Sequence, residues 1–241
     1  MKLESMTWVE VETYLNGNRG IILPTGSTEQ HGPLGLIGTD AICAREIAWA
    51  AADRCGAVVA PELAYAPAPF NMGFPGTVSL TSELFTALAG QVMASLAQHG
   101  FAKIYVLNGH GANLDCLRTA LKGIDADVRV RSWWDFEGVN ALRGAFYGDW
   151  EGMHATPSEV AITQHTHRVI KNADLGPPRK LTADYIKAHA GDKHGAPDAH
   201  RRDFPDGRVG SHSGLARPEH GTRLLETAAK EVAADYLAFV G

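Results

Sequence analysis

Short apolar runs alternate with amphipathic segments along the first half of the chain. Three of these runs adjoin glycine, proline or asparagine, which is typical of buried strands, and a fourth strand is expected where valine and arginine alternate. The expected strands cover residues 20–24, 57–60, 103–107 and 128–132. Helical patterns lie between them, over residues 41–55, over 82–100 and after Asn113. This alternation predicts an α/β domain with a mostly parallel central sheet.

The two ends of the chain also carry helical patterns. Residues 6–16 open with Thr7 as a possible N-cap, and residues 218–239 form an amphipathic helix. In between, residues 133–153 are rich in aromatic side chains, and residues 172–215 show little periodicity apart from 183–188. No internal repeat or linker divides the sequence. We therefore expect one domain over residues 1–241, with three α/β/α layers.

Composition narrows the class of protein. The 241 residues are 45% apolar and 20% charged, with a formal charge of −5 and a pI near 6.1. That charge gives no electrostatic reason to expect nucleic acid or an acidic membrane surface as a partner. No window approaches the ~18 uninterrupted apolar residues of a membrane span. The three cysteines have no metal-ligand spacing and favour a reducing compartment, so we expect a cytoplasmic protein.

The loop after the first expected strand carries residues suited to metal binding. Glu29 and His31 are two positions apart, which places both on one face of extended backbone, and Asp40 opens the following helix. Carboxylates with imidazole form the ligand mix that borderline divalent metals take. Taken alone, the same residues can be read as a solvated loop charge, a turn residue and a helix N-cap.

A second candidate group follows the third expected strand and the aromatic segment. His110 lies between two glycines directly after the strand at 103–107, and His154 and Glu159 lie where another helix begins. In parallel α/β sheets, ligands bind beyond the carboxyl ends of the strands, where Glu29 and His31 are also expected. Thr156 or Ser158 can cap the new helix. Without a functional role, Glu159 would be a first-turn carboxylate that complements the helix dipole, and His154 would be a packed loop histidine.

The chain resembles the creatininase family of metal-dependent amidohydrolases through four motifs that occur in family order. They are G-S-T-E-Q-H-G-P-L-G with a following T-D, F-P-G-T-V-S-L at 74–80, N-G-H-G-A-N at 108–113, and H-A-T-P-S-E at 154–159. Each motif is weak alone, but four in order are specific. They cover roughly residues 20–165.

This resemblance implies two divalent metal ions per subunit: zinc, manganese or iron. Glu29 and His110 would bind one ion, His31 the other, and Asp40 would bridge the two. A water activated by the ions would attack a carbon–nitrogen amide-type bond. His154 matches the family's catalytic histidine, which carries a proton to the leaving nitrogen.

The resemblance also implies substrate-contacting residues, with one departure. Ser79, Trp150 and Glu151 match positions that line or cover the substrate in creatininases proper. Those enzymes carry a metal-binding glutamate two residues after the histidine of N-G-H, where this chain has Ala112. Another branch of the family takes that carboxylate from the later helix, so Glu159 is the expected fifth ligand.

The function implied is hydrolysis of an amide-type bond, in a cyclic amide, lactam or related group, within a small nitrogenous metabolite. Alternatives are a formamide hydrolase or a metallopeptidase of the same family, and outside catalysis a silent metal- or substrate-binding subunit. The family also implies a homo-oligomer, with a hexamer as the expected form. The histidines at 189, 194, 200, 212 and 220 are expected to be solvated loop residues.

Overall fold

A computed structural model describes residues 1–170, 175–191 and 193–241. Its sheet contains β1 (Gly20–Thr25), β2 (Val58–Val59), β3 (Lys103–Asn108) and β4 (Asp127–Ser132), in the order β2-β1-β3-β4. Every pair of neighbours is parallel. The expected α/β class with a mostly parallel sheet is confirmed. The four expected strands are all present, each within two residues of its expected bounds.

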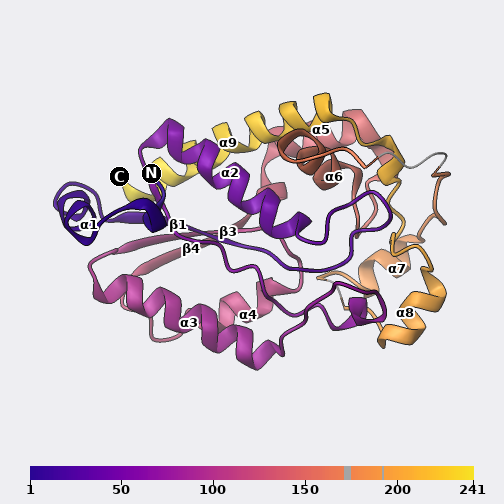
Figure 1. Cartoon of the computed structure of the whole chain (residues 1–241), viewed down its shortest axis with the longest axis horizontal. Helices are drawn as coiled ribbons and strands as arrows, with labels where there is room; N and C mark the ends of the chain where they lie inside the picture. Colours follow the sequence, from indigo (N-terminus) through magenta and orange to yellow (C-terminus); the bar gives the residue numbers. More distant parts are fainter. Residues whose placement is uncertain (171–174, 192) are drawn as a thin grey trace.

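Two layers of helices enclose the sheet (Figure 1). On one face lie α2 (Thr39–Cys55), α5 (Glu137–Tyr147), α6 (Pro157–Thr166) and α9 (Pro218–Val240), and on the other α3 (Ser82–Gln98) and α4 (Asn113–Ala120). Each layer packs its own buried apolar cluster against the sheet. The remaining helices are α1 (Trp8–Leu15), α7 (Ala183–Ala188) and α8 (Pro197–Asp203), with 3-10 turns at Leu3–Ser5, Pro69–Gly73, Trp133–Asp135, Gly148–Trp150 and Ser213–Leu215.

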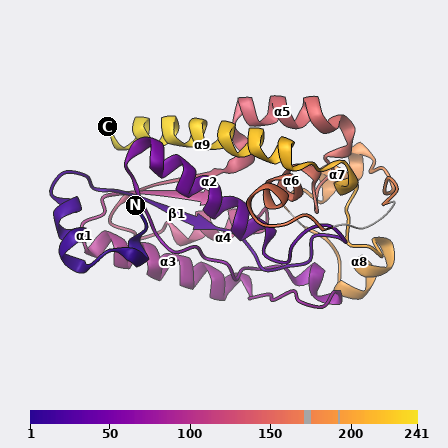
Figure 2. The ribbon, with the colours of Figure 1, turned by 45° about the horizontal axis from the view of Figure 1, so that its top comes forward.

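The register of the sheet brings three strand ends level with one another. Thr25 pairs with Asn108, and Asn108 in turn pairs with Ser132. The segments that follow β1, β3 and β4 therefore leave the sheet at the same edge. Figure 2 shows α7 and α8 beyond the same end of the molecule, with the chain termini toward the other end. Any site built from these segments lies at this edge.

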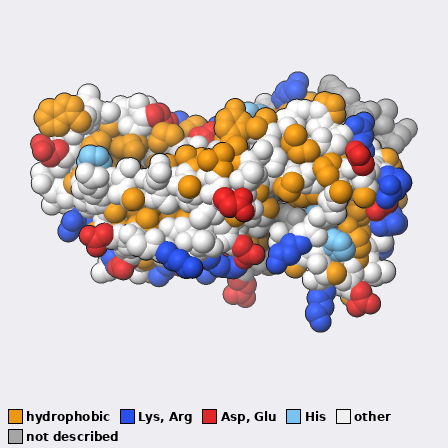
Figure 3. All heavy atoms as spheres, turned by 90° about the horizontal axis from the view of Figure 1, so that it is seen from below, with side chains coloured by type: hydrophobic (Ala, Val, Ile, Leu, Met, Phe, Trp, Pro, Cys, Tyr) orange, Lys and Arg blue, Asp and Glu red, His pale blue; other side chains and the backbone are white. Residues whose placement is uncertain are grey.

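The sequence pattern missed two helices. Helix α5 lies inside the aromatic-rich segment, and α8 lies in the stretch expected to have little periodicity. On α3, Phe85, Ala89 and Met93 are buried, whereas Leu84 is 55% exposed and Leu88 37% exposed. Figure 3 views the molecule from the side of α3 and α4, where apolar side chains are interspersed with charged ones. None of the described helices is long and apolar enough to cross a membrane.

Candidate metal centre

Five side chains expected to bind metal lie together, buried, at the carboxyl edge of the sheet. Two follow β1, one opens α2, one follows β3 and one lies in the first turn of α6. Their exposed fractions are Glu29 0%, His31 1%, Asp40 3%, His110 2% and Glu159 7%. Ionisable groups this deeply buried are paired or coordinate metals. Residues that are far apart in the sequence therefore lie together in the fold.

One oxygen of Asp40 belongs to a first group of donors. Asp40 Oδ2 lies 2.8 Å from His110 Nδ1, and that nitrogen lies 3.0 Å from Glu29 Oε1. Glu29 Oε1 is buried and makes no hydrogen bond to the described residues, although it faces this imidazole. Two carboxylates and one imidazole nitrogen, all within 4.8 Å of one another, can hold one ion.

The other oxygen of Asp40 belongs to a second group. Asp40 Oδ1 lies 2.8 Å from His31 Nε2, which lies 3.8 Å from Glu159 Oε1. These three residues form another set of donors close enough to hold an ion. A carboxylate whose two oxygens face two different donor groups is the arrangement that a bridging ligand requires. The donor set fits two divalent cations.

Glycines allow the first turn of α2 to approach the strand ends this closely. A Cβ atom on Gly26 would lie 2.3 Å from the backbone nitrogen of Ala41, and one on Gly109 would lie 2.3 Å from the carbonyl oxygen of Asp40. Real Cβ atoms do not tolerate such distances. The absence of side chains at these two positions therefore brings Asp40 beside His110.

Outer hydrogen bonds orient the two imidazoles. His110 Nε2 lies 2.8 Å from the carbonyl oxygen of Pro67, and His31 Nδ1 lies 3.1 Å from that of Glu29. A carbonyl only accepts, so each of these nitrogens carries the proton and donates. The opposite ring nitrogen of each histidine is then available to an ion when the ring is neutral. Ser27 Oγ also donates to Asp40 Oδ2 at 2.8 Å.

Glu159 has two structural roles at once. Thr156 is the N-cap of α6, and its side-chain oxygen accepts from the Glu159 backbone N–H. In return, Glu159 Oε1 accepts from the backbone N–H of Thr156, which completes a capping box. The oxygen nearest His31 is therefore also the one that caps the helix. The helix role and the ligand role are alternatives in the sequence, but this geometry is compatible with both.

Asn71 supports the cluster and was missed by the sequence analysis. This residue is fully buried in the turn at Pro69–Gly73, and its Nδ2 donates to Glu29 Oε2 at 2.7 Å. Its Oδ1 accepts from Gln30 Nε2 at 2.8 Å. The only signal in the sequence was the length of the proline-rich loop over residues 61–80, because a single asparagine in a loop has no recognisable pattern.

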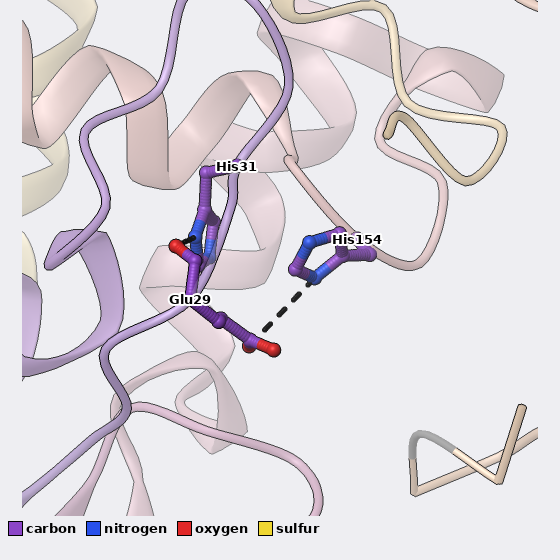
Figure 4. Close-up of side chains that lie close together, drawn as sticks. All are labelled: Glu29, His31 and His154. Atoms are coloured by element: carbon purple, nitrogen blue, oxygen red, sulfur yellow. Dashed lines mark hydrogen bonds and ion pairs between the residues drawn. The ribbon is translucent and has the colours of Figure 1, made fainter. Parts of the chain in front are cut away.

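His154 faces the same cluster from the loop before α6 (Figure 4). Its Nε2 lies 2.7 Å from the carbonyl oxygen of Gln30 and therefore donates to it, while Nδ1 lies 4.0 Å from Glu29 Oε1. Its ring centroid is 4.6 Å from that of His31. Glu29, His31 and His154 form a third set of donors that could hold an ion, so geometry alone permits a ligand role as well.

The electrostatics of the cluster divide its residues into two kinds. Burial alone would lower the pKa of His31, but the neighbouring Asp40 carboxylate outweighs it and raises that pKa to about 10. The pKa of His110 is also raised, because Glu29 and Asp40 outweigh its burial. Burial dominates at the other two: it raises the pKa of Glu159 to about 8 and lowers that of His154 to about 4. His154 is consequently neutral at pH 7.

A cavity of about 180 Å³ opens onto the cluster. Asp40, His110, His154 and Glu159 contribute to one part of its lining, and Trp133, Trp134 and Arg143 to another. Both tryptophans follow β4 directly, so the register that brings the strand ends level also brings this aromatic wall to the site. The aromatic-rich composition of residues 133–153 was the only sequence signal for it.

The three residues expected to contact substrate are not among those lining this cavity. The Ser79 hydroxyl accepts from the backbone N–H of Ala68 at 2.9 Å. The ring centroid of Trp150 lies 5.6 Å from that of His212. Glu151 Oε1 accepts from Arg143 Nε at 2.9 Å. Their roles at the substrate stay predictions.

The expectation of solvated loop residues is wrong for His200 and for His220, which lies on α9 with its ring centroid 4.1 Å from that of Phe146. His200 is 3% exposed and is not a solvated loop residue. Its ring centroid lies 5.0 Å from that of Phe70, which in turn packs 5.8 Å from that of His154. Helix α8, which the sequence did not indicate, carries His200 into this aromatic contact.

Similarity to known proteins extends over most of the chain. The model of the Creatininase family, described as creatinine amidohydrolase, matches residues 4–236. A creatinine amidohydrolase from Pseudomonas putida is 31% identical over 65% of this chain and 68% of its own length. A mycofactocin precursor peptide peptidase from Mycobacterium ulcerans is 31% identical over 60% of this chain and 57% of its own. The solved structure titled creatininase Mn superposes with a TM-score of 0.79 at 24% identity, covering 100% of this chain and 99% of that one.

Proposed function

The chain belongs to the creatininase family of metal-dependent amidohydrolases, and from this premise we propose a binuclear centre that hydrolyses a carbon–nitrogen amide-type bond in a small nitrogenous metabolite. The observation that carries the proposal is the position of Asp40. Its Oδ2 faces His110 at 2.8 Å and its Oδ1 faces His31 at 2.8 Å, which suits a carboxylate shared between two ions.

The proposed ligand set follows from the two donor groups. Glu29 and His110 would hold one ion, His31 and Glu159 the other, and Asp40 would bridge them. Mixed carboxylate and imidazole donors suit zinc, manganese or iron, so the supply of metal would decide among these.

Glu159 is the proposed substitute for the glutamate that creatininases proper carry where this chain has Ala112. The support is its distance of 3.8 Å from His31 Nε2 and its burial beside Asp40. Ala112 lies at the start of α4, and a methyl side chain offers no donor atom. The second donor group would otherwise contain one carboxylate and one imidazole only.

When bound, the ions would polarise the amide carbonyl and lower the pKa of the attacking water. The chain's own contribution to proton transfer is His154. Its Nε2 proton is engaged by the Gln30 carbonyl, so Nδ1 is the nitrogen that can accept a proton at the cluster. The buried ring is neutral, so its Nδ1 can take a proton at the cluster and pass it to the departing nitrogen.

The volume of the cavity is compatible with a small metabolite as substrate. About 180 Å³ accommodates a compact molecule, and tryptophans enclose one side of it. Hydrolysis of a formamide is the alternative that this volume also permits. A metallopeptidase stays a second alternative, because one relative is named as a peptide peptidase. Ser79, Trp150 and Glu151 keep their proposed role beside the substrate. Because none of them lines the cavity, the substrate would have to extend beyond it to reach them.

The remaining proposals concern organisation. We infer a single domain over residues 1–241, supported by one continuous sheet with cores on both faces. A homo-oligomer, with a hexamer as the expected form, rests on the family alone. A cytoplasmic setting is supported by three free thiols, of which Cys43 and Cys116 are buried.

The proposal is tested by comparing metal-loaded and metal-stripped protein on a panel of lactams, ureides, N-formyl amides and dipeptides, together with elemental analysis. We expect about two ions per chain and metal-dependent release of amine from a lactam, ureide or formamide. Two bound ions without hydrolysis of any compound would favour the silent binding subunit. One ion or none would contradict the binuclear centre.

A further inference from the structure

Helix α5 places one cationic side chain in the cavity wall. Among the described residues that line the cavity, Arg143 is the one lysine or arginine. Its side chain is 20% exposed, so it is largely removed from bulk water. A guanidinium in such a setting is positioned for recognition of a planar anion, because its donors form a rigid fork.

Neighbouring side chains hold one edge of this guanidinium. Nε donates to Glu151 Oε1 at 2.9 Å, and Nη1 donates to Asn140 Oδ1 at 2.8 Å. Ser158 Oγ donates to the same Glu151 oxygen, which fixes the carboxylate between a hydroxyl and the guanidinium. Nη2 makes no hydrogen bond to the described residues. An arginine has five N–H donors, so this arrangement fixes its orientation and leaves donors for another acceptor.

The adjoining aromatic wall has an unsatisfied donor of its own. The guanidinium carbon of Arg143 lies 5.9 Å from the ring centroid of Trp133. The indole N–H of Trp133 is buried and finds no acceptor among the described residues. Buried donors without partners are uncommon and costly in native proteins. The wall that includes Arg143 and Trp133 therefore holds unused guanidinium donors and one buried indole N–H without an acceptor among the described residues.

We propose that Arg143 anchors a carboxylate of the substrate, so that this enzyme acts on amides that also carry an acidic group. The proposal rests on the proposed function. The amide of the substrate would be cleaved at the metal cluster, and Arg143 would bind a carboxylate at the other end of the same molecule. Glu151 acts through Arg143 as a positioning residue. Glu151 does not line the cavity, so its predicted role at the substrate would be to orient Arg143.

The test compares binding of N-acetylglycine with that of its neutral counterpart N-acetylglycinamide to the zinc-loaded protein, by titration calorimetry. Hydrogen bonds to a charged partner contribute about 1.5–3 kcal/mol, so we expect N-acetylglycine to bind at least about tenfold more tightly in wild type. In Arg143→Gln this preference falls to about twofold or less, through weaker binding of N-acetylglycine alone. Arg143→Lys, which keeps the charge without the fork, falls between the two.

Arg54→Gln is the matched control, because Arg54 is an exposed arginine at the opposite end of α2 from Asp40. It should keep the full preference, with an unchanged circular dichroism spectrum in every variant. No preference in wild type, or an equal preference in Arg143→Gln, overturns the anchor, since the carboxylate would then bind the metal or nothing. The readout is separate from catalysis. Preferential binding without hydrolysis contradicts the proposed function alone, and hydrolysis that ignores the carboxylate contradicts the anchor alone.

Discussion

His31 Nε2 lies 2.8 Å from Asp40 Oδ1, so in the absence of an ion each group shifts the pKa of the other. The imidazole pKa rises to about 10 despite burial, and the carboxyl pKa is held well below its ordinary value by His31 and His110. Without metal, protonated imidazoles therefore balance the charge of the buried carboxylates. An ion that binds here must displace those protons.

The first prediction concerns proton release on metal binding. At pH 7 the metal-free protein holds protons on His31 and His110, whose pKa values are raised, and an ion requires both rings neutral. We expect zinc binding to release more than one proton per chain. The measurement is the dependence of the calorimetric binding enthalpy on the ionisation enthalpy of the buffer. His31→Gln should release fewer protons. An enthalpy independent of the buffer would contradict the ion pairs described here.

The second prediction concerns the stability of the metal-free protein as pH changes. Glu159 and His31 both have folded-state pKa values above their ordinary values of 4.5 and 6.5, near 8 and 10. Protonation of each group thus stabilises the fold fully below its ordinary pKa, and this contribution is lost as pH rises through the folded value. We expect the Tm to fall between about pH 6.5 and pH 10, because below pH 6.5 the lowered pKa of His154 acts in the opposite direction. Glu159→Gln should remove the part of this fall between about pH 6.5 and pH 8, as measured by calorimetry.

The third prediction tests Glu159 as a ligand. Replacing it with alanine removes the carboxylate from the second donor group and leaves Glu29, Asp40 and His110 intact. We expect bound metal to fall from about two ions per chain toward one, measured by elemental analysis. Glu62→Ala is the control. Glu62 belongs to neither donor group, and its carboxylate pairs with Arg45 at 2.7 Å. An unchanged metal content in Glu159→Ala would leave this residue as a helix cap only.

The fourth prediction separates the two possible roles of His154. If His154 transfers protons, His154→Ala loses about 10²–10⁴-fold in kcat and keeps both ions. If His154 is instead a ligand, as its position beside Glu29 and His31 also allows, metal content falls with activity. His165→Ala is a control, since His165 is exposed on α6 and its Nδ1 lies 3.0 Å from the Thr222 hydroxyl. Full activity in His154→Ala would contradict the proposed mechanism.

The fifth prediction concerns Asn71, which touches Glu29 and Gln30 but belongs to neither donor group. Partners of this kind orient a ligand, and their loss typically lowers metal affinity by about 10–100-fold. We expect that loss for Asn71→Ala in a competition titration with a zinc chelator. At neutral pH, Asn71→Asp should bind metal no more tightly than Asn71→Ala, because its carboxylate would lie against that of Glu29 and repel it. Wild-type affinity in both variants would reduce Asn71 to a packing role.

Residue patterns predicted the strands and most helices because these depend on local chemistry. The apolar run of β3 and the Thr7 and Thr156 caps are read from adjacent residues. The strand order β2-β1-β3-β4 depends on which edges pair, and no local pattern encodes that. Helix α5 was missed because two glycines, Gly138 and Gly144, interrupt its helical pattern.

Site residues that belong to a sequence motif could be predicted. Site residues that stand alone in the sequence were missed. Glu29, His31 and Asp40 lie in one motif, so their meeting could be predicted. Asn71 and Arg143 reach the site through the turn and helix that carry them, and neither belongs to a recognisable spacing. Their contribution depends on three-dimensional contacts alone.

One oxygen of Glu159 both faces the cluster and holds the start of a helix. Its Oε1 lies 3.8 Å from His31 Nε2 and accepts the backbone N–H of Thr156, which closes the first turn of α6. Helix α6 packs against α2 and α9, which lie in the same layer. Loss of this carboxylate would therefore loosen the start of α6 before it disturbs the sheet. Amide hydrogens of residues 156–160 would then exchange faster in Glu159→Ala than in wild type, as a local opening and not as global unfolding.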